Sequence, residues 1–143
     1  IRLAELGVVL RSVAAKDKLV TATEYEYSPA VAEGPARYRQ SLYNLARGHA
    51  LIQGRHNLEM EDVEIPLRIV LSTGPVERLR LLRHFVKGGT LSTTKEAGDI
   101  IGHAWNTANA VLVQMMQLGL IRHGSESYYL SDKYDWLMEL CSV

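Results

Sequence analysis

The chain has 143 residues, of which 47% are hydrophobic and 22% are charged, the composition of an ordinary globular protein with one or two small domains. Its 16 basic and 16 acidic residues give a formal net charge of zero, so overall charge attracts it neither to nucleic acid nor to a membrane surface. A single cysteine, Cys141, excludes an intrachain disulfide and a thiol metal cluster, and no apolar run reaches the roughly 20 residues that span a bilayer.

The N-terminal segment has a weak pattern. Apolar side chains within residues 1–19 recur at helical spacing and predict a helix there. The alternation in residues 21–27 favours an extended segment, which Pro29 and Pro35 interrupt. The chain begins with Ile1 rather than Met, so we expect a piece of a larger protein. We expect that protein in the cytoplasm, because a single cysteine suits a reducing compartment.

Two further helices are predicted in the first half. Residues 35–53 have an apolar stripe spaced by three and four, with proline in the first turn and Gly54 as the stop. Residues 61–71 begin with acidic side chains, which favour the start of a helix. Pro66 lies inside that second pattern and predicts a kink or a later start.

The interval Ser72-Thr73-Gly74-Pro75 separates two parts of the chain. Thr73 is a plausible N-cap for the next helix, with Pro75 in its first turn. We therefore predict one domain over residues 1–73 and a second over residues 74–143.

The second half predicts a helix that ends at Gly88, a short strand at residues 90–92, and a second helix capped by Thr93 or Thr94. A tight turn and a third helix to about Leu118 follow, and residues 120–130 then form a hairpin around a Gly-Ser turn. This is the order of elements in a winged helix-turn-helix, which usually presents its third helix to a nucleic-acid groove.

The face of the third helix opposite the predicted core is polar and uncharged. Asparagine and glutamine read base edges, pairing best with adenine, and threonine reaches phosphate or a thymine methyl group. The candidate DNA-binding residues on this helix are Trp105, Asn106, Thr107, Asn109, Ala110 and Gln114. The alternative is a solvated helix face without a ligand.

Phosphate contacts require cations, and affinity grows with their number. Arg80, Arg83 and Lys87 form one positive stripe on the first helix of the second half, and Arg122 and His123 lie on the predicted wing. The objection to DNA is charge, since residues 75–143 contain seven basic and seven acidic side chains. A winged helix of zero net charge also suits a protein partner.

Residues 43–63 carry a family resemblance. The order Leu-Ala-x-x-His-Ala-Leu-x-x-Gly-Arg from Leu45, followed by Glu61-Asp62-Val63, resembles the C-terminal helical lid of AAA+ ATPases, most closely the MoxR, magnesium-chelatase and MCM branches. In such ATPases a winged helix often follows the lid. The resemblance implies that a lid arginine reaches the nucleotide phosphate. Asn44 aligns best with that arginine, and Arg47, one turn later, is the substitute, with a plain exposed arginine as the alternative.

No Gly-x-x-x-x-Gly-Lys-Ser/Thr phosphate loop is present, so we expect this chain not to be an enzyme by itself and to hold no cofactor. The five histidines are scattered without metal-ligand spacing, so no metal site is expected. The cluster of Glu59, Glu61, Asp62 and Glu64 suits a dipole role at a helix start.

The sequence therefore predicts a mainly α fold, with a helical lid-like domain and a C-terminal winged helix-turn-helix with a small β-hairpin. The first hypothesis is a DNA-binding module of a larger AAA+-like ATPase, with double-stranded DNA and the ATPase core of the same protein as partners. Alternatives are a protein-interaction module and a dimeric transcription regulator. A homo-oligomer is therefore a possible state, and no membrane partner is expected.

Overall fold

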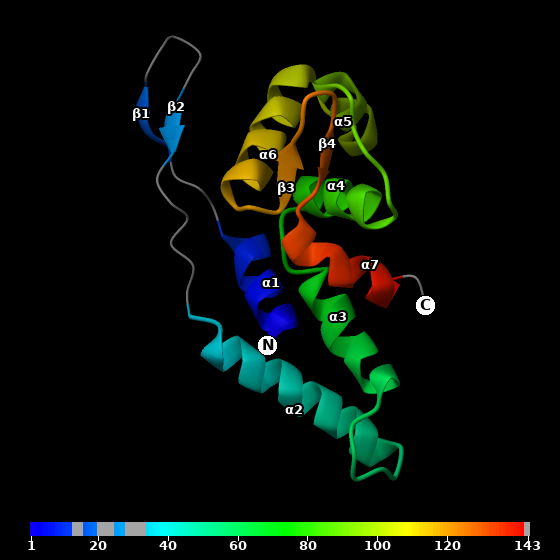
Figure 1. Cartoon of the computed structure of the whole chain (residues 1–143). Coiled ribbons are helices and arrows are strands. Elements are labelled where there is room, and N and C mark those ends of the chain that lie inside the picture. The colour runs from blue at the N-terminus through cyan, green and yellow to red at the C-terminus, as the bar shows by residue number, and fades with distance from the viewer. Residues whose placement is uncertain (13–15, 20–24, 28–33, 142–143) are drawn as a thin grey trace. The chain divides into compact units, whose positions relative to one another are not determined.

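The computed structural model describes residues 1–12, 16–19, 25–27 and 34–141. They form a mainly helical protein with small antiparallel hairpins (Figure 1). The chain divides into one unit of Ile1–Ser12 and Ala32–Pro75 and another of Val13–Val31 and Val76–Val143. The break after Pro75 lies close to the predicted one after Thr73, whereas the segment between the first two helices, which we expected in the first domain, is grouped with the second unit.

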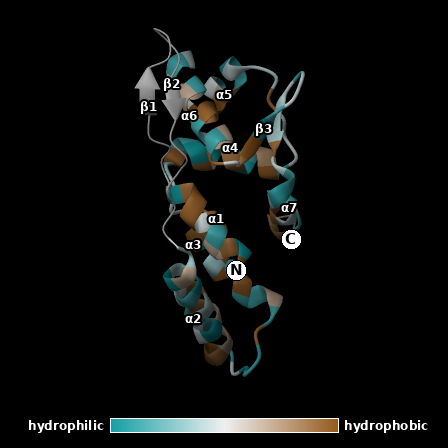
Figure 2. Ribbon diagram, turned by 60° about the vertical axis from the view of Figure 1, so that its left-hand side comes forward, coloured by the Kyte–Doolittle hydropathy of each residue, from teal (hydrophilic) through white to brown (hydrophobic). Residues whose placement is uncertain are grey.

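The first unit is built from α1 (Arg2–Arg11), α2 (Ala36–Ile52), the 3-10 turn η1 (Met60–Val63) and α3 (Glu64–Val70). Its buried side chains are mainly aliphatic and come from all three α-helices: Leu6, Leu10, Leu42, Ala46, Ala50 and Val70. The ribbon of α2 carries hydrophilic and hydrophobic residues together, as expected for a helix with one buried face (Figure 2). The prediction of this helix is confirmed.

Gly7 explains how closely α1 and α2 approach. A Cβ atom at this position would lie 2.1 Å from Cε1 of Tyr38, so only glycine admits the tyrosine ring. The guanidinium of Arg11 lies over the same ring, 4.4 Å from its centroid. A residue without a side chain thus sets the packing of the first unit.

The predicted helix over residues 1–19 is wrong beyond α1. At Ser12 the backbone is extended and the hydroxyl donates to the carbonyl of Val8 at 2.8 Å, which ends the helix. Lys16–Leu19 form strand β1, which pairs antiparallel with β2 (Tyr25–Tyr27), within the predicted extended segment.

Of two predictions at the domain boundary, the later helix start expected from Pro66 is confirmed and the cap at Thr73 is wrong. The helix expected from residue 61 begins later, as α3, so that Pro66 falls in the first turn, where a missing N–H costs no hydrogen bond. Thr73 does not cap α4. Its hydroxyl donates to the carbonyl of Val70 at 2.9 Å and thereby closes the end of α3.

The second unit contains α4 (Val76–Val86), α5 (Thr94–Ile101), α6 (Trp105–Gln117), strands β3 (Ile121–His123) and β4 (Tyr128–Leu130), the 3-10 turn η2 (Asp132–Tyr134) and α7 (Asp135–Cys141). Leu91 forms an isolated antiparallel bridge with Tyr128 and takes the place of the predicted first strand. The order is that of a winged helix-turn-helix, with the β3–β4 hairpin packed beside α6 (Figure 1).

The core of this unit holds the three helices of the motif together. Its fully buried large side chains come from α4, α5, α6, β3, α7 and two connecting residues: Leu81, Leu82, Phe85, Leu91, Ile101, Leu112, Met115, Leu120, Ile121 and Leu137. In the hairpin, Ile121 pairs with Leu130 and His123 with Tyr128. The N–H of Gly124 donates to the carbonyl of Ser127 at 2.9 Å and closes the wing turn.

Candidate nucleic-acid interface

The first turn of α6 is the most exposed part of the helix-turn-helix. Trp105 exposes 58% of its surface, and Asn106 and Thr107 are also exposed. The N-cap residue Ala104 makes no side-chain cap, and the first turn contains no acidic residue. Its N–H groups therefore point outward with the positive end of the helix dipole, which favours an anion such as phosphate.

The turn before α6 is set by two glycines. Gly102 has a φ of +74°, in the left-handed region that glycine adopts at little cost. The N–H groups of Gly102 and His103 donate to the carbonyl of Gly98 at 2.8 and 3.1 Å. A Cβ atom on Gly98 would lie 2.8 Å from the carbonyl oxygen of His103, so both positions favour glycine where α5 meets α6.

The later candidates on α6 are less available than its first turn. Asn109 and Ala110 are half-buried. Gln114 is also half-buried, and its side-chain oxygen accepts a hydrogen bond from Nη2 of Arg78 at 3.1 Å. Gln114 therefore supports the packing of α4 on α6, a role for which its position on the polar face gave no sign.

Arg78 itself was not singled out by the sequence. It exposes 2% of its surface, and burial lowers the pKa of its guanidinium. Its place among the apolar residues of α4, one residue before the buried Leu79, was the available signal. Long side chains in such positions bury their stem against a core.

The three residues of the predicted positive stripe have two different surroundings. Nη1 of Arg80 donates to the carbonyl of Ile101 at 3.1 Å, which places this guanidinium at the end of α5, just before the turn. Arg83 and Lys87 are exposed, and within the described part of the chain neither side chain has a hydrogen bond or ion pair. The stripe thus offers one fixed cation beside the turn and two free ones further along.

The wing contributes little positive charge. Arg122 lies 4.0 Å from Asp132, measured from Nη1 to Oδ2, and both side chains are well exposed. His123 stacks on Tyr128 with ring centroids 4.1 Å apart and 7° between the planes. The Arg122 guanidinium and the outer edge of His123 remain accessible, as a phosphate contact requires.

The residues that carry the lid resemblance form one polar network around Asp62, which is fully buried. Its carboxylate accepts hydrogen bonds from His49 Nδ1 at 2.6 Å, from Arg55 Nη1 and Nη2 at 2.7 and 2.9 Å, and from the N–H of Glu59 at 2.8 Å. The hydrogen bond from Arg55 is the main cause that holds the pKa of Asp62 well below its usual range.

This network corrects the role expected for the acidic cluster. Arg55 binds the carboxylates of Asp62 and Glu61. Asp62 is not simply one acidic residue of a helix start: with Glu59 it forms a capping box that closes the 3-10 turn. Because all its acceptor sites are occupied, the carboxylate is structural.

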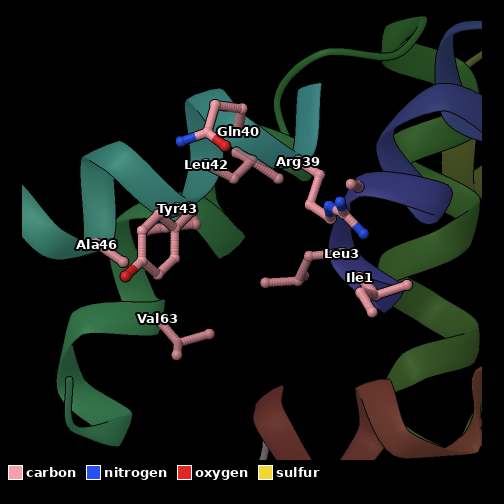
Figure 3. Close-up of a pocket in the computed structure, with 10 residues that line it drawn as sticks. Ile1, Leu3, Arg39, Gln40, Leu42, Tyr43, Ala46 and Val63 are labelled. Carbon is pink, nitrogen blue, oxygen red and sulfur yellow. The ribbon is translucent and has the colours of Figure 1, made fainter. Parts of the chain in front are cut away.

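The first unit also has an apolar hollow of about 410 Å³ between α1, α2 and η1. Leu3, Leu42 and Ala46 line it, with Arg39, Gln40 and the hydroxyl of Tyr43 as polar groups in view (Figure 3). Its lining residues include no carboxylate, histidine, serine or cysteine that would do chemistry.

Further apolar side chains lie exposed on α2 and η1: Ile52 exposes 84%, Met60 69% and Leu51 51% of its surface. Arg47, the predicted nucleotide sensor, is exposed on α2 and has no side-chain partner within the described residues.

The described residues contain no group of three His, Cys, Asp or Glu side chains placed to hold a metal ion. Among them, no helix combines the length and apolar character that crossing a membrane requires. No family model, no curated protein and no solved structure matches the chain.

Proposed function

We propose that the second unit is a DNA-binding module and that the chain belongs to a larger, cytoplasmic AAA+-like ATPase, in which the first unit is the lid. The observation that carries the DNA reading is the open first turn of α6. Exposed Asn106 and Thr107 lie in a first turn that has no side-chain cap from its N-cap residue, Ala104, and no acidic residue. Base edges and phosphate are the partners of those groups.

In this proposal the first turn of α6 enters the major groove. Arg80, fixed at the end of α5, and Arg122 on the wing bind phosphates on either side. Arg83 and Lys87 add two cations without ion-pair partners among the described residues. The turn with Gly98 and Gly102 allows the close approach of α5 and α6.

The ATPase part of the proposal rests on the resemblance and on two observations that support it. The residues of the lid-like motif, His49, Arg55 and Asp62, act together in one buried network, so their order has a structural reason. The exposed apolar residues of α2 and η1 suit a unit that packs against another domain. The chain contains no phosphate loop, and we propose no catalysis by this chain alone.

The test is fluorescence anisotropy of a labelled random-sequence duplex titrated with the chain at about 50 and about 200 mM salt, a range over which counterion release weakens phosphate binding steeply. The triple variant Arg83→Gln, Lys87→Gln, Arg122→Gln should bind weakly and with a smaller salt slope. The matched control is Arg37→Gln, Arg39→Gln, Arg47→Gln, which removes three charges from exposed positions of α2. Equal losses in both variants, or no binding by the wild-type chain, would contradict the proposal.

One observation favours a protein partner instead. Residues 75–143 contain seven basic and seven acidic side chains, so this unit has no net charge that would attract DNA. In that case α6 and the wing bind another protein, and the chain does not bind duplex DNA even at the lower salt concentration. The same titration separates the two functions.

A further inference from the structure

Trp105 is the first residue of α6 and exposes 58% of its surface. The other tryptophan, Trp136, is half-buried, and its Nε1 donates to the carbonyl of Lys133 at 3.0 Å. An indole ring is among the largest apolar groups in a protein and normally gains stability from burial. The core of the second unit therefore does not account for the position of Trp105.

The groups beside this ring are those that bind a nucleotide. The positive end of α6 is uncapped, and exposed Asn106 and Thr107 follow in the same turn. The guanidinium of Arg80 is held at the carbonyl of Ile101, just before the turn. The carboxylate of Glu77 faces His103, with Oε1 3.4 Å from Nε2. A flat aromatic face, two polar side chains and a positive helix end are thus gathered at one corner.

The indole suits the face of a base better than its edge. Its ring nitrogen is a single donor and it has no acceptor, so it reads the base-edge code poorly. Stacking uses the π-face that every base has, but in an intact duplex neighbouring bases cover those faces. A ring at this position therefore favours a base that has left the duplex stack. The zero net charge of residues 75–143 also favours a stacking contact, because phosphate contacts alone then supply little affinity.

We propose that the second unit binds DNA that contains an unpaired base, such as a junction between duplex and single strand, and that Trp105 stacks on that base. This inference rests on the proposed function and names its substrate. Asn106 and Thr107 then contact the edge of the base or the adjoining phosphate. The chain should therefore bind a tailed duplex more tightly than a blunt duplex of the same length.

The experiment uses the full chain with Trp136→Phe, which leaves Trp105 as the one tryptophan. Its emission is followed during titration with a blunt duplex and with the same duplex carrying an oligothymidine tail. Binding of the tailed duplex should quench the emission, because stacking on a base brings the indole into contact with it. Affinities for both probes are measured by anisotropy for wild type, Trp105→Ala and Trp105→Phe.

We expect Trp105→Ala to weaken binding of the tailed duplex by about 5- to 150-fold, the range that corresponds to one base–aromatic stack. Binding of the blunt duplex should weaken by a clearly smaller factor, because no unpaired base is there to stack on, and Trp105→Phe should restore part of the affinity for the tailed duplex. Tyr43→Ala, at an aromatic residue of the first unit that is half exposed, is the matched control and should change neither affinity. Because Trp105 is exposed, its replacement leaves the core intact, which circular dichroism verifies.

The outcomes separate the two proposals. Equal loss of affinity for both probes, or binding without a change in Trp105 emission, overturns the stacking inference and leaves DNA binding standing. Failure of the wild-type chain to bind any of the probes overturns both. Preferential loss for the tailed duplex supports the inference.

Discussion

Nδ1 of His49 lies 2.6 Å from Oδ1 of Asp62, and this contact joins the last turn of α2 to the 3-10 turn before α3. The ionised carboxylate has no proton to give, so the histidine is the donor. His49 is three-quarters buried there, and Arg55 binds the same carboxylate from the other side. One buried charge thereby organises the connector between two helices.

The first unit should lose stability in acid because of Asp62. Its pKa in the folded chain is well below the value of about 3.9 expected in the unfolded chain, chiefly because Arg55 donates to it. The unfolded state therefore binds the proton more readily, and the stabilisation is fully present above that value and is lost as pH falls through the folded pKa. Urea unfolding of the chain followed by far-ultraviolet circular dichroism between pH 2 and pH 7 should show this decline, and Asp62→Asn should flatten it.

Glu64→Gln is the control for that series, because Glu64 is exposed and its ion pair is with Arg68, which is also exposed. It should leave the acid dependence close to that of the wild type, as expected of a surface ion pair. An Asp62→Asn variant that kept the full decline in acid would show that another carboxylate is responsible.

Gln114 and Gln117 lie three residues apart on α6 and should respond differently to alanine. Gln114→Ala removes the acceptor at 3.1 Å from the buried Arg78 guanidinium and should lower the free energy of unfolding of the second unit by about 1–3 kcal/mol. Gln117 is exposed, and its replacement should stay within about 0.5 kcal/mol. Tryptophan fluorescence during urea unfolding reports on this unit, which contains both tryptophans. Equal effects would mean that Gln114 does not support Arg78.

Two glycine-to-alanine changes should alter the stability of the protein in opposite directions. At Gly98 the new Cβ atom would lie 2.8 Å from a backbone oxygen, so the variant should lose about 1–3 kcal/mol from overpacking at the α5–α6 turn. At Gly48, inside α2, nothing lies within 4 Å of the new atom, so alanine should gain roughly 0.5–1 kcal/mol. Thermal unfolding of the two variants beside the wild type tests both signs, and a stabilised Gly98→Ala would contradict the described turn.

Alanine replacements of Thr93 and Thr94, at the start of α5, should differ in how much stability they cost. The hydroxyl of Thr93 accepts from the N–H of Glu96 at 3.3 Å, so Thr93→Ala should cost about 1 kcal/mol. Thr94 lies inside the helix and is not the cap, so alanine there should cost less. If chemical denaturation ranked the two variants the other way, the cap would be misassigned.

Local patterns predicted much of this fold. The apolar stripe of α2, the two helices around the Gly102 turn and the hairpin at the Gly124 turn are all found close to their predicted bounds, because each depends on signals within a few residues. The strand at Lys16–Leu19 was missed because its partner, Tyr25–Tyr27, lies several residues away and the preceding helical pattern runs on into it.

The polar contacts were harder to foresee. Neither Gln114 with Arg78 nor Asp62 with His49 shows a spacing that distinguishes a buried partner from a solvated side chain, since 36 and 13 residues separate the members of the two pairs. Such pairs depend on which helices meet. In the first turn of α6, polar Asn106 and Thr107 precede the core residue Ala108, but the exposure of Trp105 was not predicted, because an aromatic ring at a helix start commonly packs under the turn.

The Asp62 network also closes a ring of chain. The segment between His49 and Asp62 runs from the end of α2 to the 3-10 turn, and the hydrogen bonds of His49 and Arg55 to Asp62 hold its two ends together without a covalent bond. The entropy of closing such a ring grows slowly, by only about 0.6 kcal/mol for each doubling of its length. Exposed His56 and Asn57, at its tip, are therefore a place where extra residues can be inserted while the ends of both helices stay in register.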